Sequence, residues 1–182
     1  MLLMDGDVRS LVEAIHASPV QAVLSVTGAG SQALAWLLGV GGASRTVLEA
    51  TIPYAQAAFV EYAGRAPGEF ASADAASALA SAAFERARKL GEDGGSVVGI
   101  GCAATIATDR LKRGEHRAFV SSARSEGVTT YALQIEKGAR NRAGEEALVS
   151  RLILNVLAEA CGVEARLALD LRPGEQVGEA TS

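Results

Sequence analysis

The sequence predicts an α/β domain with a mixed β-sheet, and three features of the chain support this fold class. Residues 20–26 form a short apolar run that ends in a glycine turn, which is typical of a strand buried on both faces of a sheet. Residues 148–157 carry apolar side chains at helical spacing and predict an amphipathic helix. Residues 117–123 and 129–136 have the pattern of two strands, and the turn between them contains Gly127, so we expect an antiparallel pair.

The remaining elements follow from the same kinds of pattern. The predicted helices span residues 5–18, 32–38, 55–63, 72–90 and 145–161, and the other strands span residues 20–26, 45–53 and 96–101. Helix 32–38 is apolar around most of its surface, so we expect it to be largely buried. The apolar side of helix 72–90 is mostly alanine, which would let it pack closely on a sheet. We expect residues 102–116 to be a long polar connection.

The end of the chain differs from the rest in composition. After Gly162 it is rich in charged residues and contains Pro173 and two glycines. Such a segment predicts a short final strand or an extended tail or linker. We therefore assign residues 1–162 to the folded domain and residues 163–182 to this tail.

Composition and charge exclude several classes of protein. The chain has 182 residues, of which 49% are hydrophobic and 21% charged, which fits one globular domain. A formal net charge of −4 argues against nucleic-acid binding through overall charge. Cys102 and Cys161 are too far apart in sequence to form a metal cluster by themselves, and His16 has no second ligand at metal spacing beside it. We predict no metal and no cofactor, a cytoplasmic location, no signal peptide and no membrane helix.

The glycine turn Thr27–Ser31 predicts an anion site. It joins a buried strand to a helix N-terminus, where free backbone N–H groups and the positive end of the helix dipole converge. Gly28–Ala33 also fits the G-x-G-x-x-[GA] dinucleotide pattern, with Glu49 about twenty residues later. Against a Rossmann domain, Glu49 is followed by further strand-like residues and the chain has few clear βαβ units. A tight turn with a purely structural role is the third interpretation.

Hydroxyl and basic side chains near this turn are the candidate functional groups. Ser25 and Thr27 end the first strand, where open α/β sheets bind ligands, and Ser31 stands at the helix start, where it can also act as a cap. Basic residues gather in two further segments: Arg110, Lys112, Arg113 and Arg117, and then Lys137, Arg140 and Arg142. The first group is either a solvated loop or the border of a ligand cleft that meets a phosphate or carboxylate.

Residues 25–54 resemble the C-terminal domain of the competence/damage-inducible protein CinA and its stand-alone relatives, the nicotinamide-nucleotide amidohydrolases. Three motifs carry the resemblance: SVTGA (25–29) stands at the family's ESCTGG, GGAS (41–44) at its PGSS, and Tyr54-Ala55 at its Tyr-Ser pair. Residues 96–101 and 102–114 look like the family's second apolar strand and glycine-rich loop, and the likeness extends over residues 8–162. The run TDRLKRGEHR (108–117) is similar to that of a divergent branch, in which some members carry a nucleotidyltransferase domain downstream.

The resemblance implies a three-layer α/β/α sandwich with a mixed sheet. It also implies binding of nicotinamide mononucleotide and hydrolysis of its amide, with Ser25 as the nucleophile. By the resemblance, Thr27, Gly28 and Tyr54 line the same pocket, and family habit implies a homo-oligomer. The candidate ligand-binding residues are Thr27, Gly28, Gly30, Ser31, Tyr54, Thr105, Arg113 and Arg117.

Two departures from the family pattern concern catalysis. Leu24 replaces the acid before the serine, and Phe59 stands where the family places a lysine, five residues after the tyrosine, as the serine's base. A phenylalanine cannot take a proton. One hypothesis is therefore a domain that binds a pyridine mononucleotide-type ligand without efficient catalysis. The alternatives are an active amidohydrolase, in which Lys112 serves as the base for Ser25, and a Rossmann-like dinucleotide binder.

Overall fold

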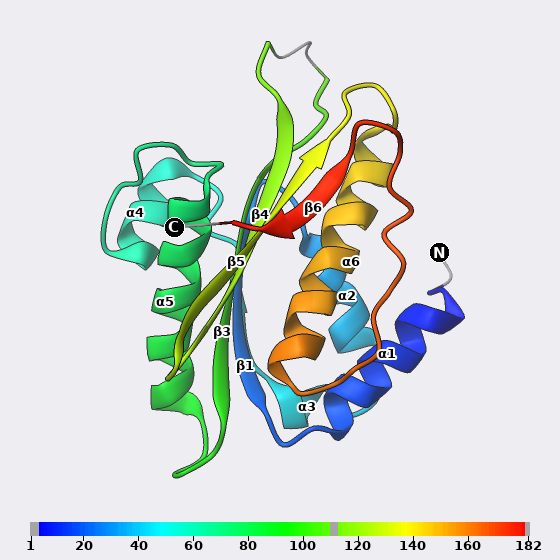
Figure 1. Ribbon diagram of the computed structural model, residues 1–182. Helices are drawn as coiled ribbons and strands as arrows, with labels where there is room; N and C mark the ends of the chain where they lie inside the picture. The colour runs from blue at the N-terminus through cyan, green and yellow to red at the C-terminus, as the bar shows by residue number, and fades with distance from the viewer. Residues whose placement is uncertain (1–3, 110–112, 181–182) are drawn as a thin grey trace.

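The chain folds around one mixed β-sheet in the computed structural model, which describes residues 4–109 and 113–180 (Figure 1). Within these residues the sheet has six strands in the order β2-β1-β3-β4-β5-β6. The strands are β1 (Gln21–Thr27), β2 (Val47–Thr51), β3 (Val97–Thr105), β4 (His116–Arg124), β5 (Gly127–Ile135) and β6 (Gln176–Glu179). Strand β1 is parallel to both β2 and β3, and β3 to β6 form an antiparallel series. The predicted mixed sheet and the antiparallel pair β4–β5 are confirmed.

Helices cover both faces of the sheet, so the predicted three-layer sandwich is also confirmed. They are α1 (Gly6–Ala17), α2 (Ser31–Gly39), α3 (Ala43–Thr46), α4 (Gln56–Ala63), α5 (Ala73–Leu90) and α6 (Arg142–Ala160). Helices α4 and α5 lie on one face, and α1, α2 and α6 pack on the other (Figure 1). In the described part of the chain, no helix combines the length and apolar character needed to cross a membrane.

Strand β1 is buried on both faces, as its apolar pattern predicts. Its alternate residues Ala22, Leu24 and Val26 join the main core under α1, α2 and α6, and Val23 packs against Ala83 and Ala87 of α5. Side chains alternate between the faces of a strand, so one short apolar run fills both layers of the core. This burial places the strand that ends in the glycine turn at the centre of the molecule.

Helix α5 lies directly on the backbone of β3, because this side of the strand carries glycines. A Cβ atom at Gly99 would lie 2.2 Å from the carbonyl oxygen of Ala80, and one at Gly101 would lie 2.3 Å from that of Ala76. Real Cβ atoms do not come this close to backbone atoms. Glycine on the strand and alanine on the helix therefore fix the short separation that the alanine-rich pattern predicts.

Three elements differ from the sequence-based expectation. Strand β3 continues through Cys102–Thr105, four residues into the segment expected to be a polar connection. Residues 45–46 belong to the short helix α3 rather than to the second strand. Helix α2 is less buried than expected, since Leu38 keeps 60% of its surface exposed. Small residues such as those of 102–105 carry little periodicity, so their burial in a strand is hard to infer from their order.

His16 is a buried histidine with both ring nitrogens bonded. Nδ1 lies 2.9 Å from the hydroxyl of Thr46, and Nε2 lies 2.9 Å from the carbonyl oxygen of Leu37. A carbonyl only accepts, so Nε2 carries the proton and Nδ1 accepts from the threonine. The side chain thus links α1 to α2 and α3.

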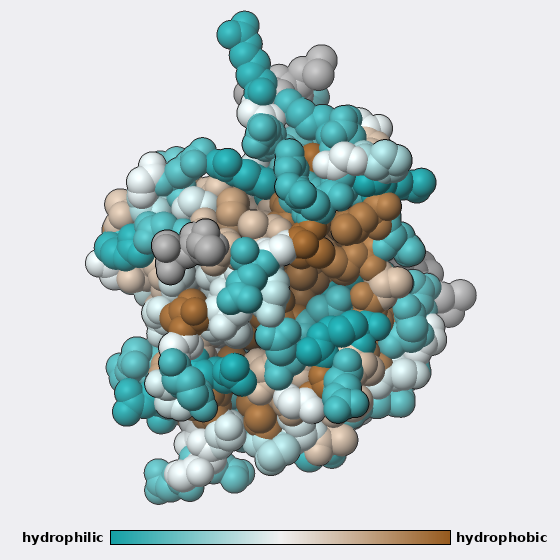
Figure 2. All heavy atoms as spheres, in the orientation of Figure 1, coloured by the Kyte–Doolittle hydropathy of each residue, from teal (hydrophilic) through white to brown (hydrophobic). Residues whose placement is uncertain are grey.

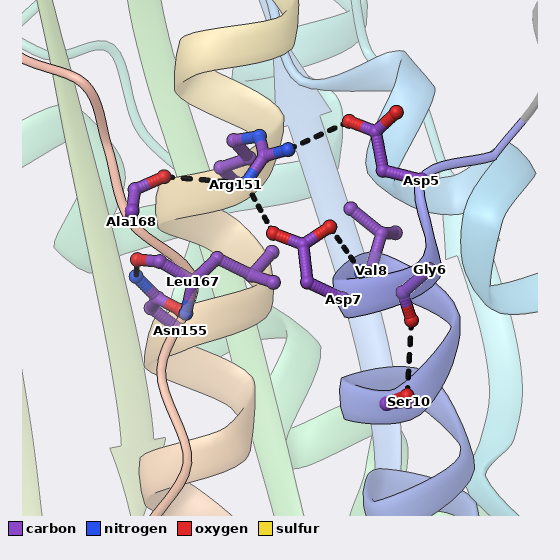
Figure 3. Close-up of polar contacts among 9 residues, drawn as sticks. All are labelled: Asp5, Gly6, Asp7, Val8, Ser10, Arg151, Asn155, Leu167 and Ala168. Carbon is purple, nitrogen blue, oxygen red and sulfur yellow. Dashed lines mark hydrogen bonds and ion pairs between the residues drawn. The ribbon is translucent and has the colours of Figure 1, made fainter.

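The segment after α6 returns along that helix to the sheet. Arg151 of α6 donates hydrogen bonds to Asp5 (2.8 Å), Asp7 (3.1 Å) and the carbonyl oxygen of Ala168 (3.2 Å), and Asn155 exchanges two hydrogen bonds with the backbone of Leu167 (Figure 3). The segment then forms β6 at the edge of the sheet. Figure 2 shows apolar surface between β6 and this segment, where Val177 and Leu169 are only partly buried.

Glu175 anchors the start of β6 to Arg140 and to nearby backbone N–H groups. Its carboxylate accepts hydrogen bonds from Arg140 and from the backbone N–H groups of Glu136 (3.2 Å) and Arg172 (2.6 Å). Burial alone would raise the pKa of Glu175, but these donors outweigh it and hold the pKa below its usual value. The stabilisation is therefore present above the ordinary glutamate pKa and lost as the pH falls through the lowered one.

We predict that β6 loosens in acid before the rest of the domain. The register of β5 and β6 and the bond from the Ala180 amide to the carbonyl oxygen of Thr130 place the Gly178 amide in a hydrogen-bonded pair with Ala132. Hydrogen exchange of the Gly178 amide, corrected for its intrinsic rate, should accelerate between about pH 4.5 and pH 3. The variant Glu175→Gln should show fast exchange already at pH 7. Equal protection of this amide at both pH values in the wild-type protein would contradict the assignment.

Candidate functional site

A cavity of about 650 Å³ opens at the carboxyl ends of the parallel strands β1 and β3. This is the edge of an α/β sheet at which ligands usually bind. Its walls come from the β1–α2 turn, α4 and the residues before it, the loop before α5, the segment after β3, and the starts of β4 and α6. We call this cavity the strand-end pocket.

Five of the predicted ligand-binding residues line the strand-end pocket: Thr27, Gly28, Tyr54, Thr105 and Arg117. The other three do not. Ser31 lines a smaller adjacent recess of about 60 Å³, Gly30 is buried beneath the turn, and Arg113 is exposed outside the pocket wall. Lys112, the predicted base, and Arg110 lie outside the described residues.

Gly28 brings the ends of β1 and β3 together at the pocket floor. Its φ is +83°, and an added Cβ would lie 1.8 Å from the carbonyl oxygen of Ala104. Both facts require glycine at this position. The turn therefore has a structural role, whatever it binds.

Two N–H groups where this turn enters α2 are already bonded within the protein, whereas the sequence predicts that they are free. Oε1 of Glu146 on α6 accepts hydrogen bonds from the amides of Gly30 (3.0 Å) and Gln32 (3.1 Å) and from the hydroxyl of Ser31 (2.9 Å). A carboxylate at the N-terminus of α2 uses the same donors and the same helix dipole that a phosphate would use. The anion at the N-terminus of α2 is therefore the side chain of Glu146, a residue 116 positions along the chain from Gly30.

The start of α6 also holds the segment that follows β3. Glu145 is fully buried, and its carboxylate accepts a hydrogen bond from the amide of Ala107 (2.7 Å) and lies 2.9 Å from Nδ1 of His116. Arg142 donates to the carbonyl oxygen of Ala107 (2.8 Å). The N–H and C=O groups of Ala107 are thus both bound by side chains from the first turn of α6. This fixes its neighbours Ile106 and Thr108 in the pocket wall.

Sequence reasoning missed the roles of Glu145 and Glu146. Acidic residues in the first turn of a helix are ordinarily explained as complements to the dipole of that helix. The signal that could have singled them out is two adjacent carboxylates at the start of a helix with many buried residues, where at least one of them has to face the core.

Arg117 crosses the pocket to the loop before α5. Its guanidinium forms an ion pair with Glu69 (2.6 Å) and lies over the ring of Phe119, 5.7 Å from the ring centroid. Both partners are partly exposed, so this ion pair is worth little in stability. A ligand carrying a phosphate or carboxylate could therefore exchange with Glu69 at small cost.

An aromatic wall faces Arg117. Phe59 is almost completely buried, and its ring meets Phe70 edge to face with centroids 5.3 Å apart. Tyr54 is 65% exposed at the rim. The residue that replaces the family's lysine is thus a packed part of the pocket wall.

Ser25 lies away from the strand-end pocket. It is fully buried in β1 and accepts a hydrogen bond from the hydroxyl of Thr51 (3.2 Å). Burial raises the pKa of the nearby Tyr62, and the hydroxyls of Thr51 and Ser25 oppose that rise. Thr51 and Tyr62 line a different cavity, of about 710 Å³, between β2, α4 and α5. In the described part of the chain, the polar neighbours Thr51 and Tyr62 offer Ser25 hydroxyls and no carboxylate, imidazole or amine as a base.

Glu49, the acid in the dinucleotide pattern, is also away from the strand-end pocket. Arg86 of α5 holds it through two hydrogen bonds, of 2.7 and 3.1 Å, and this lowers the pKa of the glutamate. To bind a ribose, Glu49 would first have to break its ion pair with Arg86.

No family model and no curated protein sequence matches the chain. Solved structures do match it over most of its length. The competence/damage inducible protein CihA from Agrobacterium tumefaciens is 16% identical, with a TM-score of 0.70 over 88% of this chain and 99% of that one. A competence-damaged protein (CinA) superfamily protein from Escherichia coli is 15% identical, with a TM-score of 0.68 over 87% and 94% of the two chains.

A third match, the CinA superfamily protein of Klebsiella pneumoniae 700603, is 11% identical with a TM-score of 0.67, over 86% of this chain and 96% of that one. Identities this low establish the fold and leave the chemistry open. The matches nevertheless agree with the motifs at residues 25–54. The chain therefore has the fold of the CinA superfamily, and its sequence has diverged far from the members to which it is similar.

Proposed function

We propose that this domain binds a small nucleotide-type ligand, of the pyridine mononucleotide class, in the strand-end pocket and does not hydrolyse it efficiently. The observation that carries the proposal is the composition of the pocket. Its volume of about 650 Å³ suits a ligand of this size, and it combines the cations Arg117 and Arg142 with threonine hydroxyls and the aromatic Tyr54 and Phe70. A cavity with apolar walls and a few convergent polar groups is the usual form of a small-molecule site.

Arginines, and not the glycine turn, would bind the phosphate. Glu146 already accepts hydrogen bonds from N–H groups at the turn, so its negative charge would repel a phosphate there. Arg117 and Arg142 line the pocket, and each guanidinium offers five N–H donors, more than the contacts described above use. A planar fork of donors suits a phosphate group.

Weak catalysis follows from the positions of Ser25 and Phe59. A serine nucleophile needs access to the substrate and a base within hydrogen-bond reach. Ser25 is buried outside the pocket, and Phe59 fills the wall where the family's lysine would stand. An active amidohydrolase would require Ser25 and a base such as Lys112 to meet the ligand.

Ammonia release from nicotinamide mononucleotide tests the catalytic part of this proposal. We expect no release above background from the wild-type protein. Release that disappears in Ser25→Ala would instead establish the active amidohydrolase. Release that persists in Ser25→Ala would assign catalysis to a different nucleophile.

Removing the charge of Arg117 should weaken binding. A charge-assisted hydrogen bond contributes on the order of 1.5–3 kcal/mol, so Arg117→Ala should raise the Kd for nicotinamide mononucleotide roughly tenfold or more. Glu69→Gln should lower the Kd, because the competing carboxylate is gone. Calorimetry at low salt measures both changes, and added salt should reduce them. Arg9→Ala, at an exposed position on α1, is the control, and unchanged affinity in both test variants would refute the role of Arg117.

We also propose that the protein is a homo-oligomer. Strand β2 is an open edge of the sheet, and Ile52, just after it, keeps 53% of its surface exposed next to Tyr54. An exposed edge with large apolar side chains favours association. Light scattering should give a mass that is a multiple of 18.6 kDa, and a single species of 18.6 kDa would refute this.

A further inference from the structure

A second cavity adjoins the strand-end pocket. It measures about 440 Å³, lies on β4, β5 and β6, and shares Glu115 and Arg117 with the strand-end pocket. Helices α4 and α5 pack mainly over the other half of this face, so this part of the sheet surface is open. The two cavities therefore meet at Glu115 and Arg117.

The floor of the second cavity is built from two rows of side chains that run across the strands. Ala132 on β5 pairs with Phe119 on β4 and with Gly178 on β6, and Gln134 pairs in the same way with Arg117 and Gln176. Within each strand these residues are two apart, so all six lie on one face of the sheet. One row is flat and largely apolar, and the other is polar. We call these rows the sheet platform.

We propose that the sheet platform is a second subsite, and that the ligand of this protein is a dinucleotide rather than a mononucleotide. The inference rests on the proposed function and extends it. One half of the ligand would occupy the strand-end pocket. Its phosphates would meet Arg117 at the junction, and the ring of the other half would lie over Ala132 and Gly178.

The chemistry of the platform suits a planar ring with polar edges. Small residues at 132 and 178 leave room for a ring, and an added Cβ at Gly178 would meet no atom within 4 Å. The amide of Gln176 donates to that of Gln134 at 3.3 Å, which leaves an amide N–H group of Gln134 and the carbonyl oxygen of Gln176 to pair with a ring edge. Glu115 and Glu179 at the rim oppose a further phosphate and favour an uncharged or cationic ring.

Calorimetry with two probes tests this inference: nicotinamide mononucleotide, and NAD⁺, which contains the same mononucleotide joined to AMP. Contacts between a base and a protein platform are worth on the order of 1–3 kcal/mol, so wild-type protein should bind NAD⁺ about tenfold more tightly or better. Gly178→Val places a side chain on the platform without strain. It should remove most of this advantage and leave the affinity for the mononucleotide unchanged.

Gly41→Val is the matched control, because Gly41 is an exposed glycine outside both cavities whose added Cβ also meets no atom within 4 Å. It should bind both probes like the wild-type protein. If the mononucleotide binds and NAD⁺ binds no more tightly, the second subsite is refuted while the proposed function stands. If the advantage of NAD⁺ persists in Gly178→Val, the platform is not where the second half binds. Binding of neither probe refutes the proposed function, and the second subsite with it.

Discussion

Replacing Gly101 by valine should strongly destabilise the fold. A Cβ at this position would lie 2.3 Å from the carbonyl oxygen of Ala76 and 2.4 Å from the amide nitrogen of Ala80, both in the backbone of α5. Neither contact can be relieved by turning a side chain, so α5 would have to move off β3. We expect a loss of about 4 kcal/mol or more, among the largest effects of a single substitution.

Thermal unfolding followed by circular dichroism measures this effect. A loss of this size should lower the Tm by roughly 10 °C or more in a domain of this length. Gly178→Val makes the same chemical change in another strand of the same sheet, where the new side chain meets no atom, and it should melt like the wild-type protein. If Gly101→Val melts within a few degrees of the wild-type protein, α5 does not lie directly on β3.

Replacing Glu145 by alanine should have the second-largest effect, on both stability and binding. The substitution leaves the buried amide of Ala107 and Nδ1 of His116 without their partner. Hydrogen bonds to charged groups contribute about 1.5–3 kcal/mol each, so the loss should reach about 3 kcal/mol. Because Ala107 then has one anchor fewer in the wall of the strand-end pocket, the affinity for nicotinamide mononucleotide should fall as well.

Glu13→Ala is the control for this prediction, because it removes an exposed helical glutamate from α1. Its free energy of unfolding, measured with urea, should lie within about 0.5 kcal/mol of that of the wild-type protein. Glu145→Gln, which keeps the shape and one acceptor oxygen, should fall between the two. A Glu145→Ala variant that unfolds at the urea concentration of the wild-type protein would show that α6 does not anchor the pocket wall.

The elements that the sequence predicts well are those whose burial follows a simple period. Strand β1 and helix α6 carry their apolar residues in one run or at helical spacing, and helix α5 carries an alanine stripe that matches its close packing on β3. The resemblance at residues 25–54 also predicts the fold, which the chain shares with solved CinA superfamily structures.

The candidate site was harder to predict, because its groups come from distant parts of the chain. Thr27, Gly28 and Tyr54 follow strand ends, a position that sequence patterns can locate. Glu146 could not be placed at the glycine turn, since no local pattern connects residues so far apart. Ser25 shares its face of β1 with Thr27 but lies two residues further into the sheet, where it is fully buried and its hydroxyl meets Thr51.

Calorimetric titration of the wild-type protein with nicotinamide mononucleotide at low salt is the most direct test of the strand-end pocket as a nucleotide site. We predict one saturable site per chain with a Kd below about 1 mM, the upper end of the usual range for small substrates. Arg117→Ala should weaken that binding, whereas Arg9→Ala should leave it unchanged. The absence of saturable binding, or binding that is indifferent to Arg117, would contradict the assignment.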